Sequence, residues 1–236
     1  SQNDETKKFL KKLGAKNIRK IGNLKFSETN LKSLNSINKT KKKFLNSKKI
    51  LLGAISTHQN EEIFCANLHL KLKKEYPNGI TIIIPRHIHR SSEIKNEIEK
   101  IGLKVHLHSF SKKKISKKTD IYLVDTFGET KSFLKVCKIV FLGGSLINHG
   151  GQNPLEAARF GCKVMHGPYI DNFLEVYELL RKNNISSKIK SLNYAKNLVK
   201  INMANKLGSR KIIKKLNFIG KEVLNNNKNE IIKYKK

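Results

Sequence analysis

Short apolar runs alternate with longer segments of helical periodicity, and this alternation constrains the fold more than any other feature. The clearest strand is GITIIIP at residues 79–85, a β-branched run that ends at Pro85. KKILLGAIS at residues 48–56 predicts a second buried strand, and residues 61–75 after it have a helical pattern. Strands that alternate with helices form parallel sheets covered on both faces. The sequence therefore predicts an α/β fold with a Rossmann-like parallel sheet.

Other segments extend the same pattern. Four shorter apolar runs predict strands, at residues 104–109, 120–125, 138–144 and 162–167. Helices are expected from Ser91 to Gly102, over 172–183 and over 209–226. With no internal repeat and no long linker, we expect one domain over residues 1–236, with a frayed tail at about 225–236. The chain begins at Ser1 with neither a methionine nor a signal peptide, so we expect it to be part of a longer protein.

The charge balance is strongly basic. The 49 Lys and Arg residues exceed the 18 Asp and Glu residues, which gives a net charge of +31. Such a chain attracts nucleic acids, anionic membranes and phosphorylated substrates. Lysines concentrate at residues 39–49 and 111–118, in expected loops, without a repeated aromatic-interleaved pattern or a recognition-helix pattern. This distribution favours solvated lysine-rich surfaces over a dedicated nucleic-acid site.

Cysteine usage and apolar run length exclude other classes. Cys65, Cys137 and Cys162 are widely spaced and form no CxxC pair, so neither a zinc site nor a redox motif is indicated. This pattern is typical of a reducing compartment. No apolar run reaches the length of a transmembrane helix.

In a doubly wound sheet, ligands bind outside the carboxyl ends of the strands, so the loops that follow strands are candidate sites. In the first, residues 56–62, Ser56 or Thr57 can cap the next helix and expose N–H groups to an anion, or form an ordinary helix start. In the second, PRHIHR at residues 85–90, Arg86 offers a forked donor to phosphate or carboxylate. His87 and His89 are interpreted as solvated loop residues rather than metal ligands.

The third and fourth loops are rich in glycine. In DTFGET at residues 125–130, Gly128 permits a close approach of backbone to ligand, although a plain strand-to-helix turn fits as well. In residues 143–161, Asn153 and Pro154 are typical of an N-cap followed by the first helical residue, and a helix start attracts anions. Glu156 is placed to accept hydrogen bonds from ribose hydroxyls. The pattern is neither GxGxxG nor a Walker loop.

These motifs occur in a specific order. They are GNLKF (22–26), STHQNEE (56–62), IIIPRH (82–87), DTFGE (125–129), FLGGSLINHGGQNPLEAARFG (141–161) and GPYIDNF (167–173). Up to about Leu180, the chain resembles the C-terminal half of 3-deoxy-D-manno-octulosonic acid (Kdo) transferases, the bacterial lipid A glycosyltransferases. It departs from that family at Ile88 and His89, where many members have Pro-Glu, and at Asp171, where an aromatic residue is common.

The resemblance implies the nucleotide-sugar half of a two-domain GT-B glycosyltransferase. Its donor would be CMP-Kdo, and its acceptor a lipid A precursor at the cytosolic face of the inner membrane. The family's CMP contacts fall on Pro85, Arg86, Phe127, Gly128, Glu129, Asn153, Pro154, Leu155 and Glu156. The family's catalytic base is a glutamate of the N-terminal domain. We therefore assign no catalytic residue to this chain and expect it to bind CMP without turnover.

The implied reaction is an inverting displacement in which CMP leaves. Arg86 and the helix start at residues 153–156 would stabilise the charge that grows on the phosphate. No cofactor or metal is expected, and no Asp-x-Asp motif is present. The basic surface would adsorb to anionic lipid, worth about 1 kcal/mol per well-placed Lys or Arg. The alternatives are a UDP-sugar transferase or epimerase of GT-B type, and a basic nucleic-acid-binding module.

Overall fold

A computed structural model describes residues 1, 4–27, 37–110, 115–204 and 208–233. The chain divides into two compact units. One unit combines Ser1–Asn30 with Arg210–Lys236, and the other is Leu31–Ser209. The larger unit contains the sheet and all the loops that carry candidate CMP-binding residues.

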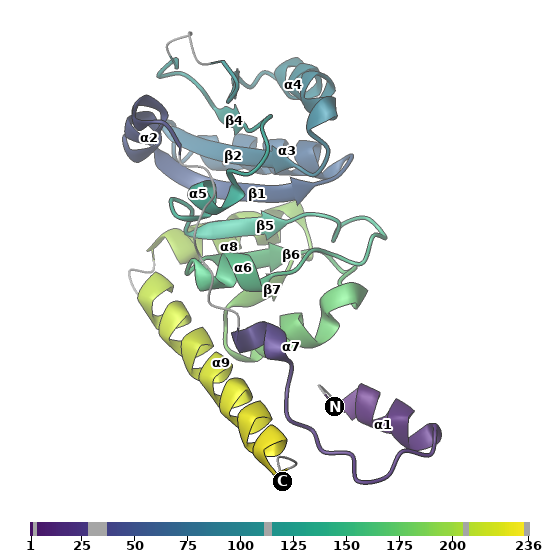
Figure 1. Ribbon diagram of the computed structural model, residues 1–236. Coiled ribbons are helices and arrows are strands. Elements are labelled where there is room, and N and C mark those ends of the chain that lie inside the picture. The colour runs from purple at the N-terminus through teal and green to yellow at the C-terminus, as the bar shows by residue number, and fades with distance from the viewer. Residues whose placement is uncertain (2–3, 28–36, 111–114, 205–207, 234–236) are drawn as a thin grey trace. The chain divides into compact units, whose positions relative to one another are not determined.

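The larger unit is built on one parallel sheet of seven strands (Figure 1). The strands are β1 (Lys49–Thr57), β2 (Gly79–Pro85), β3 (Val105–Leu107), β4 (Ile121–Leu123), β5 (Ile139–Leu142), β6 (Lys163–His166) and β7 (Ser186–Lys188). The six predicted strands are confirmed, and β7, a short polar strand, was not predicted. The order is β3-β4-β2-β1-β5-β6-β7. The strands β2, β3 and β4 therefore lie on one side of β1, and β5, β6 and β7 lie on the other side. The topological switch point lies between β1 and β5.

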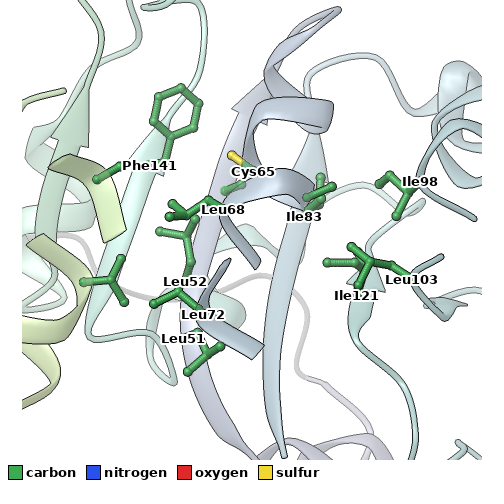
Figure 2. Close-up of a cluster of buried hydrophobic side chains, with 14 of the residues drawn as sticks. Leu51, Leu52, Cys65, Leu68, Leu72, Ile83, Ile98, Leu103, Ile121 and Phe141 are labelled. Atoms are coloured by element: carbon green, nitrogen blue, oxygen red, sulfur yellow. The ribbon is translucent and has the colours of Figure 1, made fainter. Parts of the chain in front are cut away.

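Helices cover both faces of the sheet. On one face, α3 (Glu61–Lys73), α4 (Ser91–Lys100) and α8 (Leu192–Ala204) pack against residues such as Leu52, Ile83 and Phe141, and Figure 2 shows this cluster. On the other face, α2 (Lys39–Asn46), α5 (Thr130–Leu134), α6 (Leu155–Arg159) and α7 (Leu174–Lys182) pack against residues such as Ile82 and Val140. Neighbouring residues of one strand thus pack into the cores on opposite faces of the sheet, as expected for a buried parallel sheet.

The lysine-rich segment 39–49 is not a loop, and our prediction there was wrong. Residues 39–46 form α2, because Asn38 caps the helix with its side-chain oxygen and Leu45 is buried in the core. Lysine is a good helix former, so a single apolar anchor and a cap are sufficient. In the other lysine-rich segment, residues 111–114 lie outside the described residues, and 115–118 are turn and coil.

The smaller unit contains α1 (Asp4–Lys12), the 3-10 turn η1 (Leu24–Ser27) and, from Arg210 onward, the long helix α9 (Gly208–Ile232). The motif at residues 22–26 belongs to this unit. Arg19 pairs with Glu230 at 3.1 Å, and the side chain of Asn227 donates to the carbonyl of Ile21. Residues 225–232, where we expected a frayed tail, are the last turns of α9. Among the described residues, no helix is long and apolar enough to cross a membrane.

Candidate functional site

The candidate site lies at the carboxyl edge of the sheet, around the switch between β1 and β5. The strands β4, β2, β1 and β5 are neighbours in the sheet and run in the same direction, so the loops that follow them meet at one edge. The three groups of predicted CMP-binding residues follow β2, β4 and β5. The structure therefore brings all three groups to the edge at which ligands of doubly wound sheets bind.

A buried carboxylate joins the loops on the two sides of the switch. Glu61, the first residue of α3, is 1% exposed. Its Oε2 accepts hydrogen bonds from the backbone N–H groups of His58 (2.9 Å) and Gly144 (2.7 Å). Its Oε1 accepts from those of Ser145 (3.0 Å) and Leu146 (2.9 Å). Four N–H donors compensate a buried carboxylate for the water that it loses.

The loops after β1 and β5 also approach each other closely. Ser56 has a left-handed backbone (φ 54°) at an irregularity in the pairing of β1 with β2. A Cβ on Gly143 would lie 2.1 Å from the carbonyl oxygen of Ser56, which no real side chain tolerates. Gly143 therefore serves a contact between two backbones rather than the approach of a ligand.

The loop after β2 carries Arg86. Pro85, the last residue of β2, is buried, and Arg86 is exposed. The backbone N–H of Arg86 donates to the carbonyl of Thr57 at 2.9 Å, which fixes the start of this loop beside the end of β1. The guanidinium is thus held by a rigid backbone while it remains accessible to an anion.

The loop after β4 presents Phe127, Gly128 and Glu129. Phe127 is 74% exposed. The carboxylate of Glu129 accepts a 2.6 Å hydrogen bond from Thr126 and lies 2.9 Å from Nε2 of His108, whose Nδ1 contacts the hydroxyl of Tyr122. Burial lowers the pKa of His108, and the charge of Glu129 opposes that shift. Because the Glu129 side chain already has partners, this loop is better suited to offer its backbone and the Phe127 ring.

The loop after β5 ends in the short helix α6. Asn153, which we predicted as the N-cap, lies one residue before that position, and its side-chain oxygen accepts a 3.1 Å hydrogen bond from the N–H of Leu155. Pro154 stands at the N-cap position, one residue earlier than the predicted first helical position. The side chain of Glu156 is 45% exposed, and its carboxylate lies 3.6 Å from Nζ of Lys131. Glu156 is therefore an accessible carboxylate on the rim of the site.

Three imidazoles gather between these loops. His58 follows β1, His87 follows β2, and His149 belongs to the loop after β5. The ring centroid of His58 lies 4.5 Å from that of His149 and 5.6 Å from that of His87. Burial, followed by the positive charges of His149 and His87, lowers the pKa of His58 to about 4. We call these three residues the histidine cluster.

His87 and His89 are both exposed, as expected for loop histidines. Their ring centroids are 5.7 Å apart, so His89 extends the histidine cluster at its outer side. Within the described residues, no group of three His, Cys, Asp or Glu side chains is arranged to hold a metal ion.

The segment 167–173 lies along the loop after β5. The N–H of Tyr169 donates to the carbonyl of Ser145, and the N–H of Asn172 donates to that of Gly150. Asn172 also donates from its side chain to the carbonyl of His149 at 3.3 Å. Asp171, one of the departures from the family pattern, is exposed at the start of the 3-10 turn η3 (Asp171–Phe173). The segment thus supports the loop that carries His149.

Two known proteins are similar in sequence to more than half of this chain. The probable mitochondrial 3-deoxy-D-manno-octulosonic acid transferase of Arabidopsis thaliana is 36% identical over 132 residues, which are 56% of this chain and 30% of the relative. The 3-deoxy-D-manno-octulosonic acid transferase of Aquifex aeolicus is 32% identical over 188 residues, which are 80% of this chain and 48% of the relative. This chain is homologous to the Kdo transferases. It spans less than half the length of these two relatives. No protein-family model matches the chain.

A solved structure has the same fold as this Kdo transferase homologue. It is the C-terminal CMP-Kdo binding domain of WaaA from Acinetobacter baumannii, with a TM-score of 0.65 and 22% identity, over 78% of this chain and 93% of that one. The predicted α/β fold, a Rossmann-like parallel sheet with helices on both faces, is therefore confirmed.

The first loop of this Kdo transferase homologue differs from our prediction. Neither Ser56 nor Thr57 caps α3, because both belong to β1 and Asn60 occupies the N-cap with φ 73°. The N–H of His58 is not offered to an anion either, since Glu61 accepts it. Sequence reasoning treated Glu61 as an ordinary acidic residue of a first helical turn. Its position directly after the switch-point strand was the signal that could have revealed its role.

The first turn of α3 contributes a second buried carboxylate. Nη1 of Arg90 lies 3.2 Å from Oε1 of Glu62, whose side chain is 1% exposed. Burial raises the pKa of Glu62, and Arg90 opposes that shift. Nη2 of Arg90 lies 3.2 Å from Glu93. Arg90 therefore fixes the loop after β2 to α3, whereas Arg86, four residues earlier, points to solvent.

Proposed function

We propose that this chain is the donor-binding domain of a Kdo transferase and that it binds CMP-Kdo. One observation carries the proposal: the loops with the predicted CMP contacts converge at the switch point of a chain that is homologous to Kdo transferases. The structural neighbour is a CMP-Kdo binding domain, which supports the same ligand. The four hydrogen bonds that Glu61 accepts from backbone N–H groups connect the loops after β1 and β5 at this edge of the sheet.

Different accessible groups contact the phosphate, the ribose and the cytosine of the nucleotide. Arg86 binds the phosphate, because it is exposed and can donate two parallel hydrogen bonds. Glu156 accepts hydrogen bonds from the ribose hydroxyls. The backbone of Gly128 and Glu129 and the exposed ring of Phe127 contact the cytosine. Pro85, Asn153, Pro154 and Leu155 shape the backbone that approaches the phosphate.

The reaction in the whole protein is an inverting displacement. A hydroxyl of the lipid A precursor attacks the anomeric carbon of Kdo, the bond from that carbon to the phosphate oxygen breaks, and CMP leaves. Negative charge grows on the phosphate, and Arg86 stabilises it in the transition state. The base that removes the proton of the hydroxyl belongs to another domain, so this chain alone binds the donor without transferring it.

The basic charge of the chain fits work at a membrane surface in lipopolysaccharide biosynthesis. A net charge of +31 attracts anionic lipid, and each well-placed Lys or Arg contributes about 1 kcal/mol. We place the intact protein at the cytoplasmic face of the bacterial inner membrane, where its lipid acceptor would be reached.

Nucleotide selectivity tests this proposal. A ligand that binds only the folded state raises the melting temperature. CMP should raise that of the 236-residue chain, and UMP, UDP and GDP should leave it unchanged. A preference for UDP would support a UDP-sugar transferase or epimerase instead. Sequence-specific nucleic-acid binding that persists at physiological salt, without any response to CMP, would support a nucleic-acid-binding module.

A further inference from the structure

We propose that the histidine cluster, formed by His58, His87 and His149, binds the carboxylate of the donor's sugar acid. This inference rests on the proposed function and adds a separate subsite beside the nucleotide. The ligand is a carboxylate bonded to the anomeric carbon, the same carbon that carries the phosphate. The name of the relatives' sugar, an octulosonic acid, includes this group.

The position of the cluster fits a group next to the phosphate. His87 directly follows Arg86, the proposed phosphate ligand, and His149 precedes Asn153 by four residues in the loop after β5. His58 lies between them, with ring contacts to both. A carboxylate that is three bonds from the phosphorus atom must lie close to the phosphate ligands. The three rings occupy that neighbourhood from three different loops.

One buried ring nitrogen of the cluster also lacks a hydrogen-bond partner among the described residues. His58 is 8% exposed, and its Nε2 has no hydrogen-bond partner among the described residues. The two nearest buried carboxylates are already engaged, since Glu61 accepts backbone N–H groups and Glu62 pairs with Arg90. A buried polar nitrogen without a partner is costly, and a bound carboxylate would supply the missing acceptor.

A solely structural role explains less. A proton on His58 is disfavoured first by burial and then by the positive charges of its histidine and arginine neighbours, which together lower its pKa. Gly144 lies beside both rings, since an ideal Cβ there would be in ordinary contact, at 3.5 Å, with His58 and His149. An arrangement that concentrates potential cations without a neutralising side chain is typical of an anion site. The charged and titratable groups around it are Arg86, His87, His89, Arg90, His149, Glu61 and Glu62.

Two cytidine compounds separate the sugar-acid subsite from the nucleotide site. CMP-Kdo and the methyl ester of CMP carry the same nucleotide and one phosphodiester charge, but only CMP-Kdo has a carboxylate. By isothermal titration calorimetry at pH 6, CMP-Kdo should bind about tenfold more tightly than the ester, as expected for one charge-assisted hydrogen bond in a partly buried site. The same measurement in buffers of different ionisation enthalpy should show proton uptake with CMP-Kdo alone.

Variants of the histidine cluster test whether it causes this difference in affinity. His58→Gln and His149→Gln should each remove most of the tenfold difference and of the proton uptake, and should change the affinity for the ester less than twofold. His149 is exposed, so its variant should fold even if the His58 variant does not. His69→Gln is the control, because His69 is also a buried histidine but lies beside Thr81 and Asp120, away from these loops.

The outcomes are distinct. If both compounds bind with equal affinity, or if the difference survives in the His149 variant, the carboxylate subsite is wrong while the donor-binding function stands. If neither compound binds, the proposed function fails and the subsite fails with it.

Discussion

The backbone N–H of Gly144 donates a 2.7 Å hydrogen bond to the carboxylate of Glu61, 83 residues earlier in the chain. This bond crosses the topological switch point, since Glu61 follows β1 and Gly144 follows β5. The buried carboxylate that contacts the glycine-rich stretch is thus Glu61, the first residue of α3, whereas Glu156 within the stretch is half-exposed. It holds the loop that carries His149 and leads to α6.

Replacing Glu61 by Gln should destabilise the fold by about 2–4 kcal/mol. A glutamine has one acceptor oxygen, and its NH₂ group would face backbone N–H donors that can no longer be satisfied. Urea unfolding measures the change. Glu178→Gln, at an exposed position of α7, is the control and should change the free energy of unfolding by less than about 0.5 kcal/mol. Equal stability of the two variants would show that Glu61 does not join the loops.

Replacing Gly143 by Ala should also destabilise the fold, by about 2–4 kcal/mol. The new Cβ would overlap the carbonyl oxygen of Ser56 at 2.1 Å, and backbone atoms cannot move away as a flexible side chain does. Gly102→Ala is a matched control, because Gly102 has φ 87° but no atom within 4 Å of its ideal Cβ. It should cost only the strain of a left-handed backbone, about 1–2 kcal/mol. A smaller cost at Gly143 than at Gly102 would contradict the close approach of the loops.

The sheet could be predicted from the sequence because its strands are buried on both faces. Residues 79–85, for example, are buried along their whole length and include four isoleucines. The strand β7 was not predicted, because Ser186–Lys188 are polar residues at the edge of the sheet, where they pair with β6. The helix α2 was not predicted, because its lysine-rich sequence has a single buried residue, Leu45, and so shows no apolar periodicity.

The site was predictable only in part. Arg86 and the residues around Asn153 could be located because strand ends and helix starts have local signatures. Glu61 and the histidine cluster could not, because their partners are distant in sequence and the contact depends on the strand order. A spacing of 83 residues between Glu61 and Gly144 carries no local signal. His58 and His149, whose rings touch, are separated by a similar length of chain.

Two arginines of the same loop should behave differently. Arg86→Ala should weaken CMP binding at least tenfold, the loss of a charge-assisted contact to phosphate, and leave the melting temperature of the free chain unchanged. Arg90→Ala should lower the melting temperature, because it removes the partner of the buried Glu62. Calorimetric titration with CMP and thermal unfolding without ligand separate the two effects. Unfolding of the free Arg86 variant at a lower temperature would instead assign Arg86 a structural role.

Asp120 should make stability depend on pH at the opposite edge of the sheet. Its carboxylate is 3% exposed and lies 2.7 Å from Nζ of Lys73, and it accepts a 2.9 Å hydrogen bond from the N–H of Lys104. Burial alone would raise the pKa of Asp120, but His69, Lys73 and the N–H of Lys104 outweigh burial and hold this pKa well below its usual value. The folded state therefore binds the proton of Asp120 less readily than the unfolded state.

The direction of the pH effect follows from that difference. The stabilisation is fully present above the unfolded pKa of about 3.9 and is lost as the pH falls toward the folded value. Asp120→Asn should cost about 1–3 kcal/mol at pH 7, and its disadvantage relative to the original chain should shrink from pH 5 to pH 2. Urea unfolding across this pH range tests the prediction. The control is Asp171→Asn at an exposed position, which should change the free energy of unfolding little at any pH. A disadvantage of Asp120→Asn that stays constant down to pH 2 would show that the charge of Asp120 is not what stabilises the fold.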